Sequence, residues 1–224
     1  MRLIVLAACT ALALSACKRT ETPATPATPA VPVATTPAQA ATPTNANPPH
    51  DNLNAVAWVQ TSVEYKALSE QTYRAAAEQL DKALKEKNWD ALVPEERGNA
   101  PTGLKPAVVM DVDETVLDNS PYQARLVRDG LDYDEVTWAQ WVAEKKAKPL
   151  PGVVDFAKAA AAKGVTILYI SNRAEHLKDA TLANLRSAGL PVADDSVFLG
   201  LGTFVEGCEQ NGSEKNCRRK LAGQ

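Results

Sequence analysis

Residues 107–120 read AVVMDVDETVLDNS, a short apolar run followed by a cluster of acidic residues. The run 107–110 has the length and composition of a strand buried on both faces. Ligands of an open parallel sheet bind outside the carboxyl ends of its strands, and Asp111 and Asp113 stand at such an end. In extended backbone both side chains point the same way, so that one carboxylate can attack a substrate while the other moves protons. Two close anions also favour a hard cation such as Mg²⁺, although an acidic turn that caps the next helix has the same composition.

A second polar cluster follows another apolar run, residues 165–170. This run predicts a buried strand that ends in the polar residues 171–173, just before a predicted helix over 175–188. A hydroxyl, an amide and the N-terminal amides of a helix together make a cradle for phosphate. Later in the chain, Lys215 supplies a point charge that suits the same ligand.

The order of predicted elements indicates an α/β fold with a parallel sheet. Helical spacing of apolar residues marks 52–87, 132–146, 153–163 and 175–188, a loop covers 94–106, and buried-strand patterns mark 107–110, 165–170 and 196–199. Strands that alternate with helices of this length build a Rossmann-like sheet flanked by helices on both sides. The folded part, 51–224, has the size of one ordinary domain.

The first 50 residues differ in composition from the rest of the chain. A basic start, a short apolar run and small residues predict a secretory signal over 1–17, whose end, LSAC, resembles the lipobox of bacterial lipoproteins. An ordinary secretion signal with an incidental cysteine is the alternative. Residues 18–50 are rich in Pro, Thr and Ala and predict a disordered tether. We therefore expect lipidation of Cys17, attachment to the membrane through the lipid and, because Lys18 follows, an outer-membrane lipoprotein whose domain faces the periplasm or the cell surface.

Charge, histidines and cysteines narrow the possible functions. The formal net charge of −3 gives no broad basic field, so nucleic acid is not expected as a partner. His50 and His176 are the only histidines, which disfavours a histidine nucleophile or a serine triad. In an exported protein Cys208 and Cys217 are candidates for a disulfide, with two free thiols as the alternative, and no second Cys/His pair lies nearby for zinc. The sequence does not indicate an oligomeric state.

The motifs resemble those of the haloacid dehalogenase (HAD) superfamily of phosphotransferases. Asp-x-Asp-x-Thr at 111–115 follows the first strand, a serine follows the second, and a lysine comes later. The longer run 111–121, the tryptophan-bearing segment 137–142, the stretch 149–152 and a late Lys-x-x-Arg-Arg are similar to class C acid phosphatases. These are bacterial lipoproteins that hydrolyse nucleoside monophosphates and other phosphomonoesters. The resemblance covers roughly residue 55 to the end and implies an N-terminal helical segment and a small helical cap beside the sheet.

The resemblance also implies a Mg²⁺-dependent phosphomonoesterase, an acid phosphatase of the 5'-nucleotidase type, that works through an aspartyl-phosphate. Asp111 would attack phosphorus and bind the metal through its carboxylate. Asp113 would protonate the leaving group, then activate water, and bind the metal through its backbone carbonyl. Thr115 would orient the loop that carries both.

Four further residues receive roles from the same resemblance. Ser171 and Lys215 would hold phosphate oxygens as charge develops. Asn172 and Arg173 would border the substrate, although Arg173 at a helix start is equally well explained as a surface residue. Together with Asp111, Asp113 and Thr115, these four residues form the predicted site.

The chain departs from the family pattern in two places. Residues 122–125 read Tyr-Gln-Ala-Arg where relatives carry an aromatic residue for nucleobase stacking. The fourth motif, a strand that ends in further acidic metal ligands, is absent before Gln224, so we expect one or more C-terminal strands to be missing. The alternative function is therefore a weak or inactive surface lipoprotein that binds phosphate or nucleotide. Trp138 and Trp141 either stack a nucleobase or belong to the core.

Overall fold

The computed structural model describes residues 50–87, 89–97, 103–208 and 213–223. The predicted signal, the lipidation site Cys17 and nearly all of the predicted tether lie outside these ranges. The elements are α1 (Leu53–Thr61), α2 (Val63–Ala83), η1 (Pro94–Glu96), β1 (Ala107–Met110), β2 (Leu117–Asp118), α3 (Ser120–Asp129), α4 (Glu135–Glu144), β3 (Lys148–Pro149), α5 (Val153–Ala162), β4 (Thr166–Ala174), η2 (Glu175–Leu177), α6 (Lys178–Ser187), η3 (Asp195–Val197), β5 (Phe198–Leu201) and α7 (Asn216–Ala222). No helix among the described residues has the length and apolar character needed to cross a bilayer.

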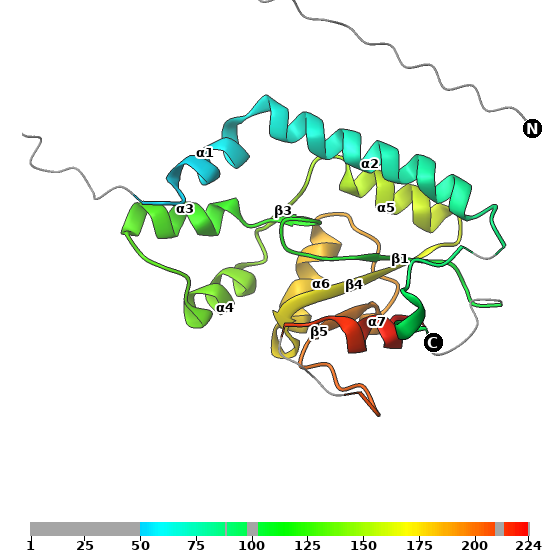
Figure 1. Ribbon diagram of the computed structural model, residues 1–224. Helices are drawn as coiled ribbons and strands as arrows, with labels where there is room; N and C mark the ends of the chain where they lie inside the picture. The colour runs from blue at the N-terminus through cyan, green and yellow to red at the C-terminus, as the bar shows by residue number, and fades with distance from the viewer. Residues whose placement is uncertain (1–49, 88, 98–102, 209–212, 224) are drawn as a thin grey trace, which may run out of the picture. The chain divides into compact units, whose positions relative to one another are not determined.

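Three of the strands form a parallel sheet in the order β1-β4-β5 (Figure 1). Met110 pairs with Tyr169, which pairs in turn with Phe198, so the carboxyl ends of the three strands lie at one edge of the sheet. A short antiparallel ribbon joins β2 to β3. The parallel α/β architecture predicted from the sequence is confirmed.

Helices cover the sheet and bury its apolar side chains. Helix α5 packs against β4, α2 lies along α5, and α6 contacts β5 (Figure 1). The shared core includes the strand residues Ile167, Tyr169 and Phe198, each less than 5 % exposed. This burial is the main force that holds the carboxyl ends of the strands in place.

Strand β1 is less buried than its sequence suggests. Its burial pattern runs exposed, intermediate, exposed, buried, and Val109 is 46 % exposed. The prediction of a strand buried on both faces is therefore wrong for β1. The reason is its position: in the described sheet it has a neighbour on one side only, and an apolar run of four does not distinguish an edge strand from a central one.

Helix α3 was not expected from apolar periodicity, although local signals mark both of its ends. Pro121 stands in its first turn, where a missing N–H costs nothing, and Gly130 ends it in the left-handed conformation at φ 64°. Helix α4 is capped by Asp134, whose side chain accepts from the backbone N–H groups of Val136 and Thr137. These two helices are the small helical addition to the sheet.

Candidate active site

The acidic loop after β1 is a tight turn that contains two fully buried valines. Val112 and Val116 have no exposed surface, and the N–H groups of Val116 and Leu117 both donate to the Val112 carbonyl at 2.8 Å. Glu114 between them adopts a left-handed backbone with φ 55°. The hydroxyl of Tyr73 on α2 donates to the Thr115 carbonyl, so the N-terminal helix also holds the loop.

Asp111 lies at the open side of this loop. Its Oδ1 accepts from the N–H of Val112 at 2.8 Å and forms an ion pair with Nζ of Lys215 at 2.8 Å. The side chain of Asp111 is 40 % exposed and that of Lys215 is 23 % exposed. The first predicted catalytic residue and the predicted phosphate-holding lysine therefore meet, although 104 positions separate them.

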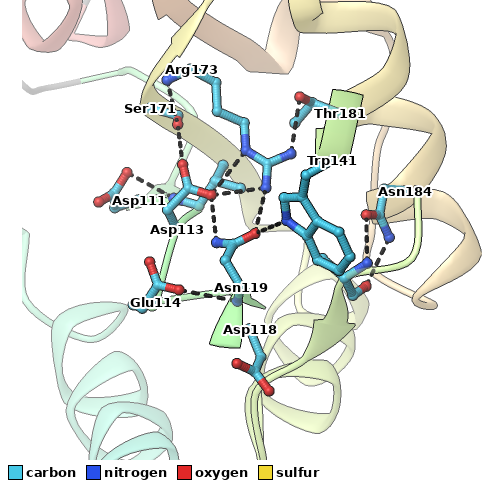
Figure 2. Close-up of polar contacts among 12 residues, drawn as sticks. Asp111, Asp113, Glu114, Asp118, Asn119, Trp141, Ser171, Arg173, Thr181 and Asn184 are labelled. Atoms are coloured by element: carbon cyan, nitrogen blue, oxygen red, sulfur yellow. Dashed lines mark hydrogen bonds and ion pairs between the residues drawn. The ribbon is translucent and has the colours of Figure 1, made fainter. Parts of the chain in front are cut away.

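Asp113 has a different set of partners (Figure 2). Its Oδ1 accepts from Nε and Nη2 of Arg173, at 2.9 and 2.8 Å, and from Nδ2 of Asn119 at 2.8 Å. The Ser171 hydroxyl lies 3.4 Å from Oδ2. Thus each predicted catalytic carboxylate has its own cation, a lysine for Asp111 and an arginine for Asp113.

Arg173 is held in place from several directions. Its side chain is 1 % exposed, its guanidinium lies over the Trp138 ring at 5.4 Å, and Nη1 donates to the Thr181 hydroxyl at 3.3 Å. A buried guanidinium needs such partners because removing a charge from water is costly. Arg173 thus lies behind Asp113, and its burial contradicts the alternative of a surface residue at a helix start.

Ser171 and Asn172 lie in strand β4 itself. The strand continues to Ala174, so the predicted strand end at residue 170 is wrong. The helical segment begins at Glu175 as predicted, first as the 3-10 turn η2 and then as α6 from Lys178. Backbone pairing with β5, through a register shift between Ile170 and Ala174, keeps this segment extended. The Ser171 hydroxyl accepts from the Arg173 N–H at 3.0 Å.

Arg218 joins the end of β4 to the helix that follows Lys215. Its guanidinium is fully buried and donates to the Ser171 carbonyl, to the Asn172 side-chain oxygen at 2.9 Å and to the Glu214 carbonyl at 3.1 Å. Burial lowers the pKa of this guanidinium. Asn172 is therefore engaged by Arg218, and Arg218 was predicted only as part of a motif.

A disulfide lies next to Lys215. Cys208 and Cys217 are joined, with their Cα atoms 5.8 Å apart, and Cys217 is 1 % exposed. The bridge closes onto the first turn of α7, two positions after Lys215. It thereby restrains the segment that presents the lysine to Asp111.

The oxygen atoms around Asp111 and Asp113 match the ligands that Mg²⁺ takes. Magnesium is commonly held by one or two carboxylates together with water and substrate phosphate. The Asp111 carboxylate is partly exposed, and no hydrogen bond found among the described residues ends on the Asp113 carbonyl. Within the described ranges no group of three or more His, Cys, Asp or Glu side chains could hold a metal ion by itself. The residues present fit a magnesium ion that keeps several waters.

The fold and these paired carboxylates define an α/β protein with an acidic site at the carboxyl ends of its parallel strands. The family model described as HAD superfamily, subfamily IIIB (acid phosphatase), matches residues 18–210. The chain belongs to this family. Among solved structures it is similar to the class C acid phosphatase from Bacillus anthracis, with 39 % identity and a TM-score of 0.62.

That match covers 76 % of this chain and 63 % of the Bacillus protein. A second structure of the same protein, with tungstate bound, matches at 39 % identity and a TM-score of 0.63 over the same shares of the two chains. The chain thus spans less than two thirds of the length of these relatives.

Sequence reasoning missed one buried pair in the site. Asn119 accepts at Oδ1 from the indole N–H of Trp141 at 2.8 Å, and both residues are at most 3 % exposed. Trp141 was noted only as a stacking or core residue. Asn119 directly before a helix has an ordinary explanation as a cap, so no local signal marks it.

Proposed function

We propose that this protein is a Mg²⁺-dependent phosphomonoesterase that forms a phosphoryl intermediate on Asp111. The observation that carries the proposal is the difference in contacts between the two carboxylates. Asp111 is exposed beside Lys215, whereas Asp113 is clamped by Arg173 and Asn119. Family membership and the tungstate-bound relative support it, because tungstate is a tetrahedral oxyanion like phosphate.

In the first half-reaction the carboxylate of Asp111 forms a bond to phosphorus as the ester P–O bond breaks. Asp113 gives its proton to the departing ester oxygen, which leaves as an alcohol. Lys215 exchanges its pairing with Asp111 for a phosphoryl oxygen and compensates the charge that develops there. A Mg²⁺ ion bound by Asp111 and the Asp113 carbonyl would reduce the repulsion between the carboxylate and the phosphate dianion.

In the second half-reaction Asp113 takes a proton from water. The water oxygen bonds to phosphorus, the Asp111–phosphorus bond breaks, and inorganic phosphate is released with Asp113 again protonated. A residue that alternates between acid and base suits both halves of this cycle. Ser171, whose hydroxyl lies 3.4 Å from Asp113, would hold a phosphoryl oxygen. Thr115, whose carbonyl accepts from the Tyr73 hydroxyl, would orient the loop.

The test is phosphate release from an aryl phosphate with millimolar Mg²⁺. We expect activity that EDTA abolishes and Mg²⁺ restores, and a loss of at least about a thousandfold in Asp111→Asn. Asp81→Asn on α2 serves as the matched control and should retain activity, because Asp81 pairs with Lys163, which lies just before the N-terminal end of β4. A folded wild-type protein that binds phosphate without releasing it from esters would favour the alternative, a phosphate-binding lipoprotein.

A nucleoside monophosphate is the substrate class that we propose. A cavity of about 390 Å³ lies beside the acidic loop, lined by Trp58, Tyr65 and Tyr73 together with Glu114 and Thr115. Trp58 and Tyr65 pack edge to face at 5.3 Å, an arrangement that leaves ring surface for an aromatic group. Comparison of kcat/KM for a nucleoside 5'-monophosphate and for ribose 5-phosphate tests this, and equal values would contradict it.

We further propose that Cys17 carries a lipid anchor and that residues 18–50 tether the domain to the outer membrane. The support is the LSAC end of the apolar run and the Pro/Thr/Ala-rich composition that follows. Cys17→Ser should move the protein from the membrane fraction to the soluble fraction of its host. An unchanged distribution would contradict lipidation.

A further inference from the structure

We propose that Asn119 is a positioning residue that fixes the Asp113 side chain and reserves its Oδ2 for proton transfer. The inference rests on the phosphomonoesterase function proposed above. It concerns a residue that contacts neither Asp111 nor Lys215 in the described contacts. Figure 2 shows Asn119 between Asp113 and Trp141.

The orientation of the Asn119 amide is dictated by its partners. Its Oδ1 accepts from Trp141 Nε1 at 2.8 Å and from Arg173 Nη2 at 3.3 Å. An indole N–H and a guanidinium are donors only, so the oxygen must face them. The amide nitrogen then faces Asp113 and donates to its Oδ1 at 2.8 Å.

Helix capping does not explain Asn119. Asparagine is frequent before a helix because its side chain accepts from the first free N–H groups. Asn119 precedes α3, yet its side chain makes no capping hydrogen bond. Only its carbonyl takes part in the helix, as the acceptor from Tyr122 N–H at 2.9 Å. The side chain is directed to Asp113 instead.

The two oxygens of Asp113 are consequently unequal. Three N–H groups converge on Oδ1, two from Arg173 and one from Asn119. An oxygen that accepts three hydrogen bonds has no lone pair left for a proton. Among the described residues only the Ser171 hydroxyl, at 3.4 Å, approaches Oδ2, and the Asp113 side chain is 24 % exposed.

Proton transfer must therefore use Oδ2. The proton on Oδ2 goes to the ester oxygen as the P–O bond breaks, and a proton from water returns to Oδ2 in the second half-reaction. Asn119 holds the carboxyl plane so that Oδ2 stays on the exposed side. Without its amide N–H, the carboxyl group can rotate away and the leaving group departs without assistance.

The decisive variant is Asn119→Asp, which keeps the shape but replaces the N–H donor by an acceptor facing Asp113. The measurement is kcat/KM for n-butyl phosphate and for 2,4-dinitrophenyl phosphate, because kcat/KM covers the steps up to loss of the leaving group. An alkoxide needs a proton and a dinitrophenolate does not. We expect the alkyl ester to lose about a hundredfold and the activated aryl ester less than about threefold.

Two further variants make the result specific. Trp141→Phe keeps the buried ring but removes the N–H that fixes the amide, and should lower the alkyl-to-aryl ratio by about tenfold or less. Asn184→Asp is the matched control, since Asn184 is 2 % exposed and donates to the Ala147 carbonyl at 2.9 Å. It should cost stability without changing the ratio. Equal losses for both substrates in Asn119→Asp would overturn the proposal.

A measurement on the metal-free protein separates this proposal from the proposed function. The chain has four tryptophans, so the Trp141 indole N–H resonance is identified by its loss in Trp141→Phe. We expect this N–H to exchange slowly with solvent in the wild type and faster in Asn119→Leu, which keeps the size of the side chain but removes the Oδ1 acceptor. A wild-type protein without phosphatase activity but with slow exchange would refute the function alone. Fast exchange in the wild type would refute the position of Asn119.

Discussion

Two carboxylates that stand two positions apart in the chain occupy opposite environments. Asp111 is 40 % exposed, and its Oδ1 pairs with the Lys215 ammonium at 2.8 Å. Asp113 is 24 % exposed, and its Oδ1 accepts from a buried arginine and a buried asparagine. Sequence proximity alone would have made them equivalent. The difference comes from which segments reach each side of the loop: the residue before α7 for Asp111, and β4 with the residue before α3 for Asp113.

This contrast shows how one short loop can serve two chemical roles. A nucleophile must be reached by the substrate and must exchange its counter-ion for phosphate. An acid and base must keep one orientation through both half-reactions. Substitutions of the residues that contact Asp113 should therefore impair proton transfer. Substitutions near Lys215 should impair the binding of phosphate.

The largest effect on stability is expected from removing Arg173, the cation that pairs with Asp113. Arg173→Met leaves a partly buried carboxylate without its cation, and should lower the free energy of unfolding by about 3 kcal/mol. Arg125→Met is the matched control, because Arg125 also pairs with a carboxylate, Glu144, and also lies over a tryptophan, Trp141, at 5.0 Å. That pair is 40 % and 27 % exposed, so its loss should cost clearly less than the loss of Arg173. Urea unfolding compares the two, and similar losses would contradict a buried role for Arg173.

A smaller effect is expected on the Lys215 side. Replacing Cys208 and Cys217 by serine removes the closure next to Lys215, which should cost about 2–3 kcal/mol in the chain-entropy model. With Lys215 less well positioned, kcat/KM should fall roughly fivefold. The loss should be the same for alkyl and activated aryl phosphates, unlike that of Asn119→Asp. Dithiothreitol should reproduce it in the wild type, and a selective loss for alkyl esters would refute the division of tasks.

The smallest effect concerns acid stability away from the site. The Arg125 guanidinium, with help from Lys146, holds the pKa of Glu144 at about 2, below its ordinary 4.5. Because the folded state resists protonation, this pair contributes stability above about pH 4.5 and loses it as the pH falls toward 2. Glu144→Gln should therefore lower Tm at pH 6, and the difference from wild type should vanish near pH 2. A difference that grows as the pH falls would contradict this sign.

Much of the fold and of the site could be predicted from the sequence because the signals are local. The apolar runs before Asp111 and Ser171 gave the parallel strands, and the spacing of Asp111 and Asp113 gave the candidate chemistry. Exposure of β1 could not be predicted, because it depends on which strands lie beside it. Helix α3 could have been predicted from Pro121 and Gly130, whose positions at its two ends are strong signals.

The residues that hold Asp113 in place could not be predicted from the sequence. Arg173 follows a strand and Asn119 precedes a helix, and each has an ordinary local explanation. Their contact with Asp113 arises only when β4 lies beside β1 and α4 brings Trp141 to Asn119. Arg173 and Asn119 are each only 1 % exposed, and such burial is a tertiary property that no local pattern encodes.

The most direct test of the account is to trap the phosphorylated enzyme. Rapid acid quenching during turnover of a radiolabelled phosphomonoester, followed by borohydride reduction, converts an aspartyl-phosphate to homoserine and marks its position by mass spectrometry. We predict homoserine at position 111 in the wild type and more of it in Asn119→Asp with an activated aryl ester. We predict none in Asp111→Asn. A mark on another residue, or turnover by Asp111→Asn above about 1 % of wild type, would contradict the assignment of Asp111 as nucleophile.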